Sequence, residues 1–214
     1  MKLIVKNVCK SIRRKEILTD INLQLCSGKI YGFMGKNGSG KTMLFRALSG
    51  LISIDSGTIS WNGKMLHKDF SILPNLGITI ENAGLYPKLT GVQNLSYLAD
   101  LTHRIGKEEI NKAITRVGLD PQDKRTFGKY SMGMKQRLAI AQAIMEKPDI
   151  IMLDEPTNGL DKSGVEEIRK IMLEEKERGA LILLASHSEE DMRLLADQIY
   201  EMENGHIVMR RASE

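Results

Sequence analysis

The stretch that decides the fold is GKNGSGKT, from Gly35 to Thr42, which fits the phosphate-binding pattern G-x-x-x-x-G-K-[ST]. The residues before it, KIYGFMG, have the apolar pattern of a strand, and TMLFRALSGL after it has helical spacing closed by Gly50. Glycines let the backbone curl so that successive N–H groups point at a phosphate, and the helix N-terminus adds partial positive charge. The sequence therefore predicts a strand, a nucleotide-binding loop and a helix, rather than a simple glycine turn before a helix.

This loop supplies most of the expected nucleotide contacts. Lys41 would reach the β- and γ-phosphates, and the hydroxyl of Thr42 would ligate Mg²⁺. The residues that we expect to contact the nucleotide here are Gly35, Lys36, Asn37, Gly38, Ser39, Gly40, Lys41, Thr42 and Met43. A phosphate cradle alone does not distinguish a nucleotide that is cleaved from one that is only bound, so further residues must decide.

Two later apolar runs predict buried parallel strands. DIIMLD (Asp149–Asp154) and ALILLAS (Ala180–Ser186) are continuously apolar, and the helical pattern VEEIRKIMLEEKERG lies between them, as in a βαβ unit. The first run ends in Asp154 and Glu155. One carboxylate would lie beside the metal and the next would polarise a water in line with the γ-phosphate, whereas the structural alternative is an acidic pair that closes a buried strand.

The remaining patterns predict how the rest of the chain is arranged. LIVKNV and INLQL alternate like half-buried strands of an antiparallel edge sheet, and Asn204-Gly205 predicts a hairpin near the C-terminus. Helical patterns dominate between about Glu81 and Lys147. We expect one α/β domain over residues 1–214, with a P-loop NTPase (RecA-like) core, a mostly parallel central sheet, an antiparallel edge subdomain and a helical subdomain inserted at about 82–147.

Composition limits the classes of partner. The chain has 31 Lys and Arg against 27 Asp and Glu, so its formal charge is +4 and its pI about 9.0. That excess suits an anionic ligand or a membrane surface without requiring either, and it is too small to argue for nucleic acid. Cys9 and Cys26 have no metal-ligand spacing, and we expect them to be reduced. The N-terminus lacks the pattern of a secretory signal, and the longest apolar runs are too short to span a bilayer.

With these motifs in this order, nearly the whole chain resembles the ATP-binding cassette (ABC) ATPases. YSMGMKQR, Tyr130–Arg137, is similar to the family's LSGGQ signature, which separates ABC ATPases from other P-loop proteins. The resemblance implies that Ser131 and Gly133 contact the γ-phosphate bound by a partner cassette, although the same stretch also reads as a loop that caps the following helix. It also implies that NGLD, Asn158–Asp161, is the D-loop at the dimer interface.

The resemblance further assigns catalytic and metal-binding roles. Glu155 would be the general base or the group that orients the attacking water, and Lys41 would stabilise the transferring phosphoryl. His187 would be the switch histidine that contacts the γ-phosphate, although a lone histidine after a strand is more often structural. Asp154 and Thr42 would organise Mg²⁺, and Glu81 stands at the Q-loop glutamine position, where it would also ligate Mg²⁺ or position water.

Some positions depart from the family pattern. Met132 and Met134 replace the signature's first glycine and its glutamine. Ile12 stands where the family has an aromatic ring that stacks on adenine, and such a stacking contact contributes about 1–3 kcal/mol at other base-binding sites. We therefore expect weaker nucleotide binding and looser base selectivity.

The resemblance implies an ATPase that pairs with a second copy or with a different cassette and powers a separately encoded permease, on the inner face of the cell membrane. ENAGLYPKLTG with YSMGMKQR resembles the subunits of bacterial export systems for drugs and peptide antibiotics. We expect docking near Glu81–Leu95, where Leu85, Tyr86 and Leu89 either line a groove for a partner helix or form local core.

Two rival functions stay open at this stage. One is a non-transport ABC ATPase that acts on DNA or ribosomes, although such relatives usually carry a long coiled coil, zinc hooks or tandem cassettes, which this sequence lacks. The other is a P-loop kinase or GTPase, against which YSMGMKQR and the His187 motif count; no guanine-reading N-K-x-D occurs in the sequence. Fractionation with membranes or with nucleic acid would discriminate these classes.

Overall fold

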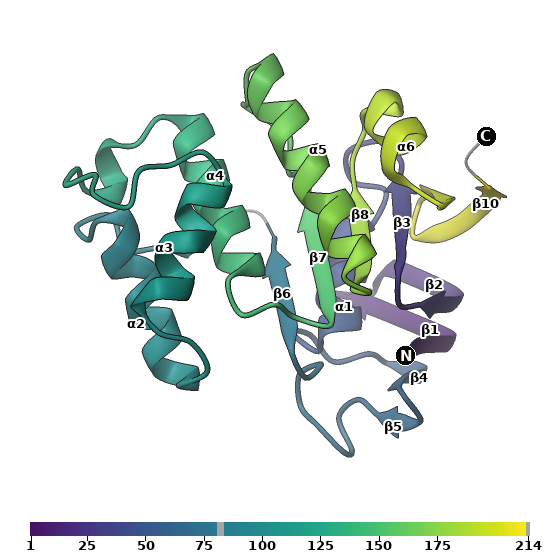
Figure 1. Ribbon diagram of the computed structural model, residues 1–214. Coiled ribbons are helices and arrows are strands. Elements are labelled where there is room, and N and C mark those ends of the chain that lie inside the picture. Colours follow the sequence, from purple (N-terminus) through teal and green to yellow (C-terminus); the bar gives the residue numbers. More distant parts are fainter. Residues whose placement is uncertain (81–83, 213–214) are drawn as a thin grey trace.

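A six-stranded sheet forms the centre of the molecule in the computed structural model, which describes residues 1–80 and 84–212 (Figure 1). Its strand order is β10-β9-β3-β8-β7-β6, and all neighbours are parallel except β10 and β9. The strands are β3 (Lys29–Met34), β6 (Leu76–Thr79), β7 (Ile150–Asp154), β8 (Leu181–Ala185), β9 (Gln198–Glu203) and β10 (His206–Ala212). The expected mostly parallel sheet is confirmed.

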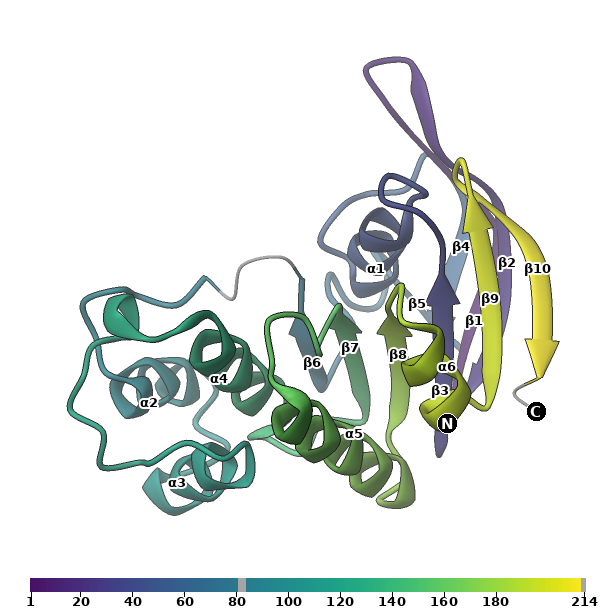
Figure 2. The same ribbon diagram turned by 90° about the horizontal axis from the view of Figure 1, so that it is seen from above.

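A second, antiparallel sheet has the order β2-β1-β4-β5. It consists of β1 (Lys2–Ile12), β2 (Lys15–Cys26), β4 (Ser56–Trp61) and β5 (Lys64–Met65). The hairpin of β1 and β2 extends beyond the rest of the molecule (Figure 2). The edge subdomain expected from LIVKNV and INLQL is therefore present, and β4 and β5 enlarge it.

Helices cover both faces of the central sheet. Figure 2 shows α1 (Lys41–Ser49) on one face, and α5 (Lys162–Glu177) and α6 (Glu189–Leu195) on the other. Gly50 ends α1 in a left-handed conformation, as the sequence predicts. This layering leaves the edge where the parallel strands end open to loops that carry polar residues.

The segment between β6 and β7 is helical where the structure describes it. It contains α2 (Gly91–Thr102), α3 (Lys107–Arg116), a 3₁₀ turn (Phe127–Lys129) and α4 (Met132–Ile144), which lie to one side of the sheet (Figure 1). A capping box between Thr90 and Gln93 begins α2. None of the helices in the described part of the chain combines the length and the apolarity needed to span a membrane.

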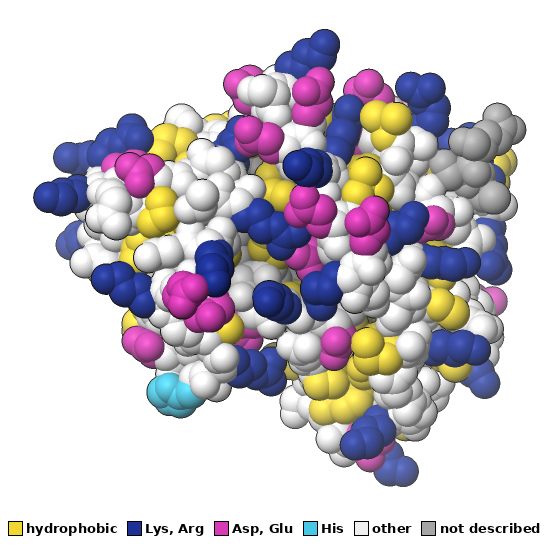
Figure 3. Space-filling view, in the orientation of Figure 1, with side chains coloured by type: hydrophobic (Ala, Val, Ile, Leu, Met, Phe, Trp, Pro, Cys, Tyr) yellow, Lys and Arg dark blue, Asp and Glu magenta, His cyan; other side chains and the backbone are white. Residues whose placement is uncertain are grey.

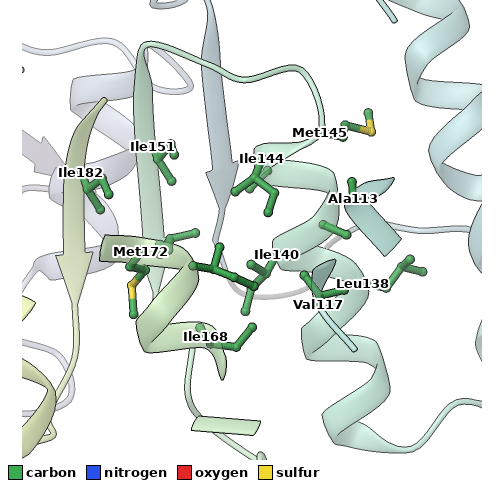
Figure 4. Packing of buried hydrophobic residues seen from close by; sticks show 14 of the residues in the cluster. Ala113, Val117, Leu138, Ile140, Ile144, Met145, Ile151, Ile168, Met172 and Ile182 are labelled. Atoms are coloured by element: carbon green, nitrogen blue, oxygen red, sulfur yellow. The ribbon is translucent and has the colours of Figure 1, made fainter. Parts of the chain in front are cut away.

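Two hydrophobic cores lie on the two faces of the central sheet. Because successive strand residues point to opposite faces, Ile151 and Leu153 of β7 join the core with α4 and α5, while Ile150 and Met152 join the core with α1 and the antiparallel sheet. Figure 4 shows the first core, where side chains of α3, α4 and α5 meet those of β7 and β8. Double burial explains the continuous apolar runs of the two strands.

Ion pairs also join the helical segment to α5. Arg116 on α3 contacts Glu174 at 2.7 Å, and Arg137 on α4 contacts Glu167. On the face shown in Figure 3, Lys and Arg side chains alternate with Asp and Glu side chains, and neither charge forms a large separate patch. The helical segment is thus held to the sheet layer through both apolar packing and charged contacts.

Candidate functional site

The candidate site lies where three neighbouring parallel strands end. The glycine-rich loop follows β3, Glu155 follows β7, and His187 follows β8, which lies between the other two strands. The carboxyl ends of parallel strands meet at one edge of a sheet, where ligands bind in folds of this kind. The topology thus gathers three motifs that are far apart in the sequence.

The glycine-rich loop is folded around the side chain of Lys41. This lysine is 7% exposed, and its ammonium group donates hydrogen bonds to the carbonyl oxygens of Gly35 at 2.6 Å and Lys36 at 3.3 Å. The hydroxyl of Ser39 is buried without a hydrogen-bond partner in the described structure. A buried cation and an unused hydroxyl at the start of a helix suit an anionic ligand such as a phosphate.

Thr42 and Asp154 meet across the site. The Thr42 hydroxyl donates to the Asp154 carboxylate at 2.6 Å, so two hard oxygen ligands are already together. Such oxygens suit Mg²⁺, which is usually bound by one or two carboxylates together with substrate phosphates. Among residues 1–80 and 84–212, no three His, Cys, Asp or Glu side chains gather into a metal cluster. Glu81, the third expected ligand, lies outside the described residues.

Glu155 is held in an unusual backbone conformation. Its φ is +49°, in the left-handed region that is strained for a residue with a side chain. Three hydrogen bonds keep it there: its N–H donates to the Ala185 carbonyl, and its own carbonyl accepts from Asn158 N–H and from the Gln136 amide. Its carboxylate lies 2.8 Å from Nδ1 of His187. Two of the three residues expected to be catalytic, Glu155 and His187, are therefore in direct contact.

Two cavities adjoin the loop and share Asn37, Gly38 and Ser39. The first, of about 630 Å³, is also lined by the rest of the loop from Gly40 to Met43 and by Asp154 and Glu155. The second, of about 760 Å³, is lined by Gly35, Lys36 and His187. Every residue expected from the glycine-rich loop lines one cavity or the other.

Some residues that line the first cavity were not predicted from the sequence to contact the nucleotide. The β1–β2 hairpin contributes Lys15, Glu16 and Ile17, and the β9–β10 turn contributes Asn204 and Gly205. Ile12, the position expected beside the base, is 42% exposed and is not among the lining residues. The Asn204-Gly205 pair predicts the turn between β9 and β10, which contributes these two residues to the cavity lining. No local sequence pattern indicates that this turn lies beside the glycine-rich loop.

The signature-like segment begins α4. Ser131 is the N-cap residue, and its hydroxyl accepts a hydrogen bond from the Met134 N–H at 3.2 Å. Neither Ser131 nor Gly133 lines the two cavities described above, although their exposed neighbour Met132 does. A Cβ on Gly133 would lie 3.1 Å from the Gly159 carbonyl, so this segment packs closely against the NGLD turn.

The loop before α2 separates its apolar residues into two groups. Leu85 is buried in the core, whereas Tyr86 is 50% exposed and packs edge to face against Tyr97, which is 47% exposed, at 5.3 Å between ring centroids. Buried Asn94 holds the loop by accepting from Tyr86 N–H and donating to its carbonyl. Leu85 is therefore part of the core, whereas Tyr86 faces outward.

Known proteins resemble this chain along nearly its whole length. The sequence model of the family described as "ABC transporter" matches residues 18–158. The "Uncharacterized ABC transporter ATP-binding protein YybJ" of Bacillus subtilis (strain 168) is 46% identical over 203 residues, which cover 95% of this chain and 93% of that protein. The "Bacitracin transport ATP-binding protein BcrA" of Enterococcus faecalis is 38% identical over 95% of this chain and 67% of that protein.

A solved structure shares the fold. The "Dimeric Structure of MJ0796, a Bacterial ABC Transporter Cassette" superposes with a TM-score of 0.90 over 99% of both chains, at 21% sequence identity. At that identity the likeness shows the architecture alone. It agrees with the α/β core, the edge sheet and the helical segment described above.

Proposed function

This chain belongs to the ABC transporter family of ATP-binding proteins, and from that premise we propose that it hydrolyses ATP to power a separately encoded membrane permease. The proposed cargo is a peptide antibiotic or a similar drug, moved outward. The name of BcrA supports this choice, because that relative is named for bacitracin transport. The proposed place of the protein is against the inner face of the membrane, held there by the permease.

One observation carries the hydrolytic part of the proposal. The glycine-rich loop, the Thr42–Asp154 pair and the Glu155–His187 pair meet at one edge of the sheet, beside a cavity of about 630 Å³. A cradle for phosphates, two oxygen ligands for a metal and a carboxylate near the phosphate site are the parts that phosphoryl transfer requires. These parts come from three segments of the chain: the loop after β3 that includes Thr42, the end of β7 with Asp154 and Glu155, and the segment after β8 with His187.

We assign the roles as follows. Lys41 and the loop N–H groups stabilise the charge on the transferring phosphoryl group. Glu155 orients the attacking water and accepts its proton, and His187 holds the Glu155 carboxylate and contacts the γ-phosphate. Thr42 and Asp154 would hold Mg²⁺, which supplies charge neutralisation at the β- and γ-phosphates when bound.

We propose that each complete site is shared between two cassettes. Ser131 and Gly133 would contact the γ-phosphate bound by the partner cassette, with the exposed N-terminus of α4 offering N–H groups to an anion. Turnover would then depend on association and would rise steeply with protein concentration. A second copy of this chain and a different cassette are both compatible partners.

We propose that the permease docks on the outward-facing rings of Tyr86 and Tyr97. Leu101, four residues after Tyr97 on α2, lies on the same helix face and is also exposed, so the three side chains offer an apolar surface to a partner helix. Leu85 anchors this loop to the core of the helical segment. Under this proposal, a movement of the permease against the two rings would displace the helical segment as well.

The test of hydrolysis compares the wild type with Glu155→Gln in two measurements: the rate of ATP hydrolysis, and dimerisation followed by light scattering at increasing Mg²⁺-ATP. The amide keeps the shape and a hydrogen bond to His187 but accepts no proton, so turnover should fall about 10²–10⁴-fold and a stable ATP-bound dimer should accumulate. Glu166→Gln, at an exposed position of α5, is the matched control and should behave like the wild type. If Glu155→Gln hydrolyses ATP at the wild-type rate, the assignment of the general base is wrong.

The docking surface is tested separately in cells that contain the permease. Tyr86→Glu should abolish transport while the purified protein keeps its basal ATPase rate, because the ring contacts no residue of the nucleotide site in the described structure. Ile72→Glu, at another exposed apolar position, is the control and should leave transport intact. Loss of ATPase activity together with transport in Tyr86→Glu would contradict docking at this surface.

A further inference from the structure

A buried hydrogen-bond network lies behind the Glu155–His187 pair. Asp191 of α6 is 1% exposed, and one of its carboxylate oxygens accepts a hydrogen bond from the Thr157 hydroxyl at 2.7 Å. The other oxygen accepts from Nε and Nη2 of Arg169 on α5, at 2.7 and 2.5 Å. A buried carboxylate is expensive unless it is paired and hydrogen-bonded, and here one carboxylate joins three segments of the chain.

These three segments include the two that carry the catalytic pair. Thr157 follows Glu155 by two residues, and Asp191 follows His187 by four residues, which is about one helical turn. The segment after β7 and the segment after β8 therefore touch twice: at the surface through Glu155 and His187, and in the interior through Thr157 and Asp191. Two contacts restrict the relative rotation of the segments far more than one does.

The interior contact is the better anchored of the two. Ser188 caps α6 by accepting from the Asp191 N–H at 3.2 Å, and Arg169 also contacts the exposed carboxylate of Glu190 at 2.8 Å. His187, by contrast, has a side chain that is 63% exposed, so water and ligand phosphates compete for it. The Thr157–Asp191 contact is therefore the more protected of the two from competition by water and ligands.

A favourable charge interaction with the N-terminus of α6 does not by itself explain why Asp191 is buried. Glu189 and Glu190 also lie in the first turn of α6 and are exposed, so they already place negative charge near the helix N-terminus. Asp191 instead points into the interior, where its partners come from α5 and from the turn that follows Glu155.

We propose that Thr157 and Asp191, braced by Arg169, are positioning residues that set the geometry of Glu155 and His187 for ATP hydrolysis. They do not touch the nucleotide site, and they act through the catalytic pair. This inference rests on the proposed function, and it adds a determinant of turnover that lies outside the cavity lining.

The primary test replaces the Thr157 hydroxyl while both charges of the buried pair remain. Thr157→Val should lower kcat about tenfold and leave the KM for Mg²⁺-ATP within about twofold, because near-attack geometry is lost and binding contacts are kept. Thr157→Ser, which restores the hydroxyl, should recover most of the wild-type kcat. Thr115→Val, at an exposed position of α3, makes the same chemical change away from the network and should change neither constant.

A double mutant separates positioning from general stability. If Thr157 acts by setting the contact between Glu155 and His187, which His187→Ala removes, adding Thr157→Val to the His187→Ala background should lower kcat by less than twofold further. An unchanged kcat in Thr157→Val overturns the proposal. So does an equal tenfold loss in both backgrounds, or a loss confined to KM.

A spectroscopic readout keeps the test independent of turnover. The ¹⁵N resonance of His187 Nδ1 should shift in Thr157→Val and, should that variant fold poorly, in Asp191→Asn, but not in Thr115→Val. If the wild type hydrolyses no ATP, the proposed function fails, and this spectrum still decides the positioning role. An Nδ1 resonance that is the same in all the variants overturns it.

Discussion

Replacing Gly205 by alanine should weaken both the stability and the nucleotide binding of this protein. Gly205 is the second residue of the Asn-Gly turn between β9 and β10, with φ of +81°. A Cβ there would lie 2.4 Å from the Ile17 carbonyl oxygen, and Cβ contacts shorter than 3.0 Å essentially do not occur. Because the obstacle is backbone, the turn and β2 must separate by about 0.6 Å or more.

The same turn braces the glycine-rich loop. The Gly205 N–H donates to the Ser39 carbonyl at 2.9 Å, and the Gly205 carbonyl accepts from the Thr19 N–H at 3.0 Å. A displaced turn therefore moves the loop that cradles the phosphates. Since misplacement by about 1 Å can lower a catalytic rate on the order of 10²-fold, we expect kcat/KM for ATP to fall at least tenfold.

The chain provides a matched control in another Asn-Gly turn that joins two strands. Gly63, between β4 and β5, has the same φ of +81°, but a Cβ there meets nothing within 4 Å. Gly63→Ala should lose only the backbone term, about 1–2 kcal/mol, or roughly 2–8 °C in Tm for a domain of this size. Gly205→Ala adds an overpacking term of about 1–3 kcal/mol.

The assays are thermal unfolding followed by circular dichroism, titration with a fluorescent ATP analogue, and steady-state ATPase kinetics, which give kcat/KM. Gly205→Ala should have a lower Tm than Gly63→Ala and should bind the analogue more weakly, whereas Gly63→Ala should bind it like the wild type. Equal Tm values and equal affinities in the two variants would refute the bracing role of the turn.

Three further predictions concern pH, the base and the core. Hydrogen bonds from the Gly164 N–H and then from Ser163 lower the pKa of Asp161, so the stability that this cap contributes is complete above its ordinary pKa of 3.8 and is lost as the pH falls through the lowered value. Urea midpoints measured across this range should show a smaller acid dependence in Asp161→Asn, and an identical dependence would contradict the assignment. Ile12→Tyr should tighten ATP binding by about 1–3 kcal/mol in equilibrium titration if the base stacks there, and an unchanged Kd would place the base elsewhere. Leu184→Ala, at a fully buried position of β8, should lower the free energy of unfolding by about 2–5 kcal/mol in urea denaturation, and a loss below 1 kcal/mol would contradict its place in the core.

The sequence predicts much of the central sheet because local chemistry is distinctive there. Continuous apolar runs signal β7 and β8, and the glycine pattern signals the turn between β3 and α1. It misses β6, whose four residues LGIT are too few to show a period. It also misses α6, whose seven residues are rich in acidic side chains.

The chemical groups of the site can be named from the amino-acid sequence: a phosphate-binding loop, an acidic pair after one buried strand and a histidine after another. Each of these is a local pattern, because glycine geometry, strand burial and helix capping depend on neighbours along the chain. Which of these groups come into contact depends on the three-dimensional fold. The contact of Glu155 with His187, the buried link from Thr157 to Asp191 and the bracing of Ser39 by Gly205 all join residues from different elements. These contacts follow from strand order and register, which are set by the packing of two cores on one sheet. Because that packing joins distant segments, strand order and register cannot be predicted from any single stretch of sequence.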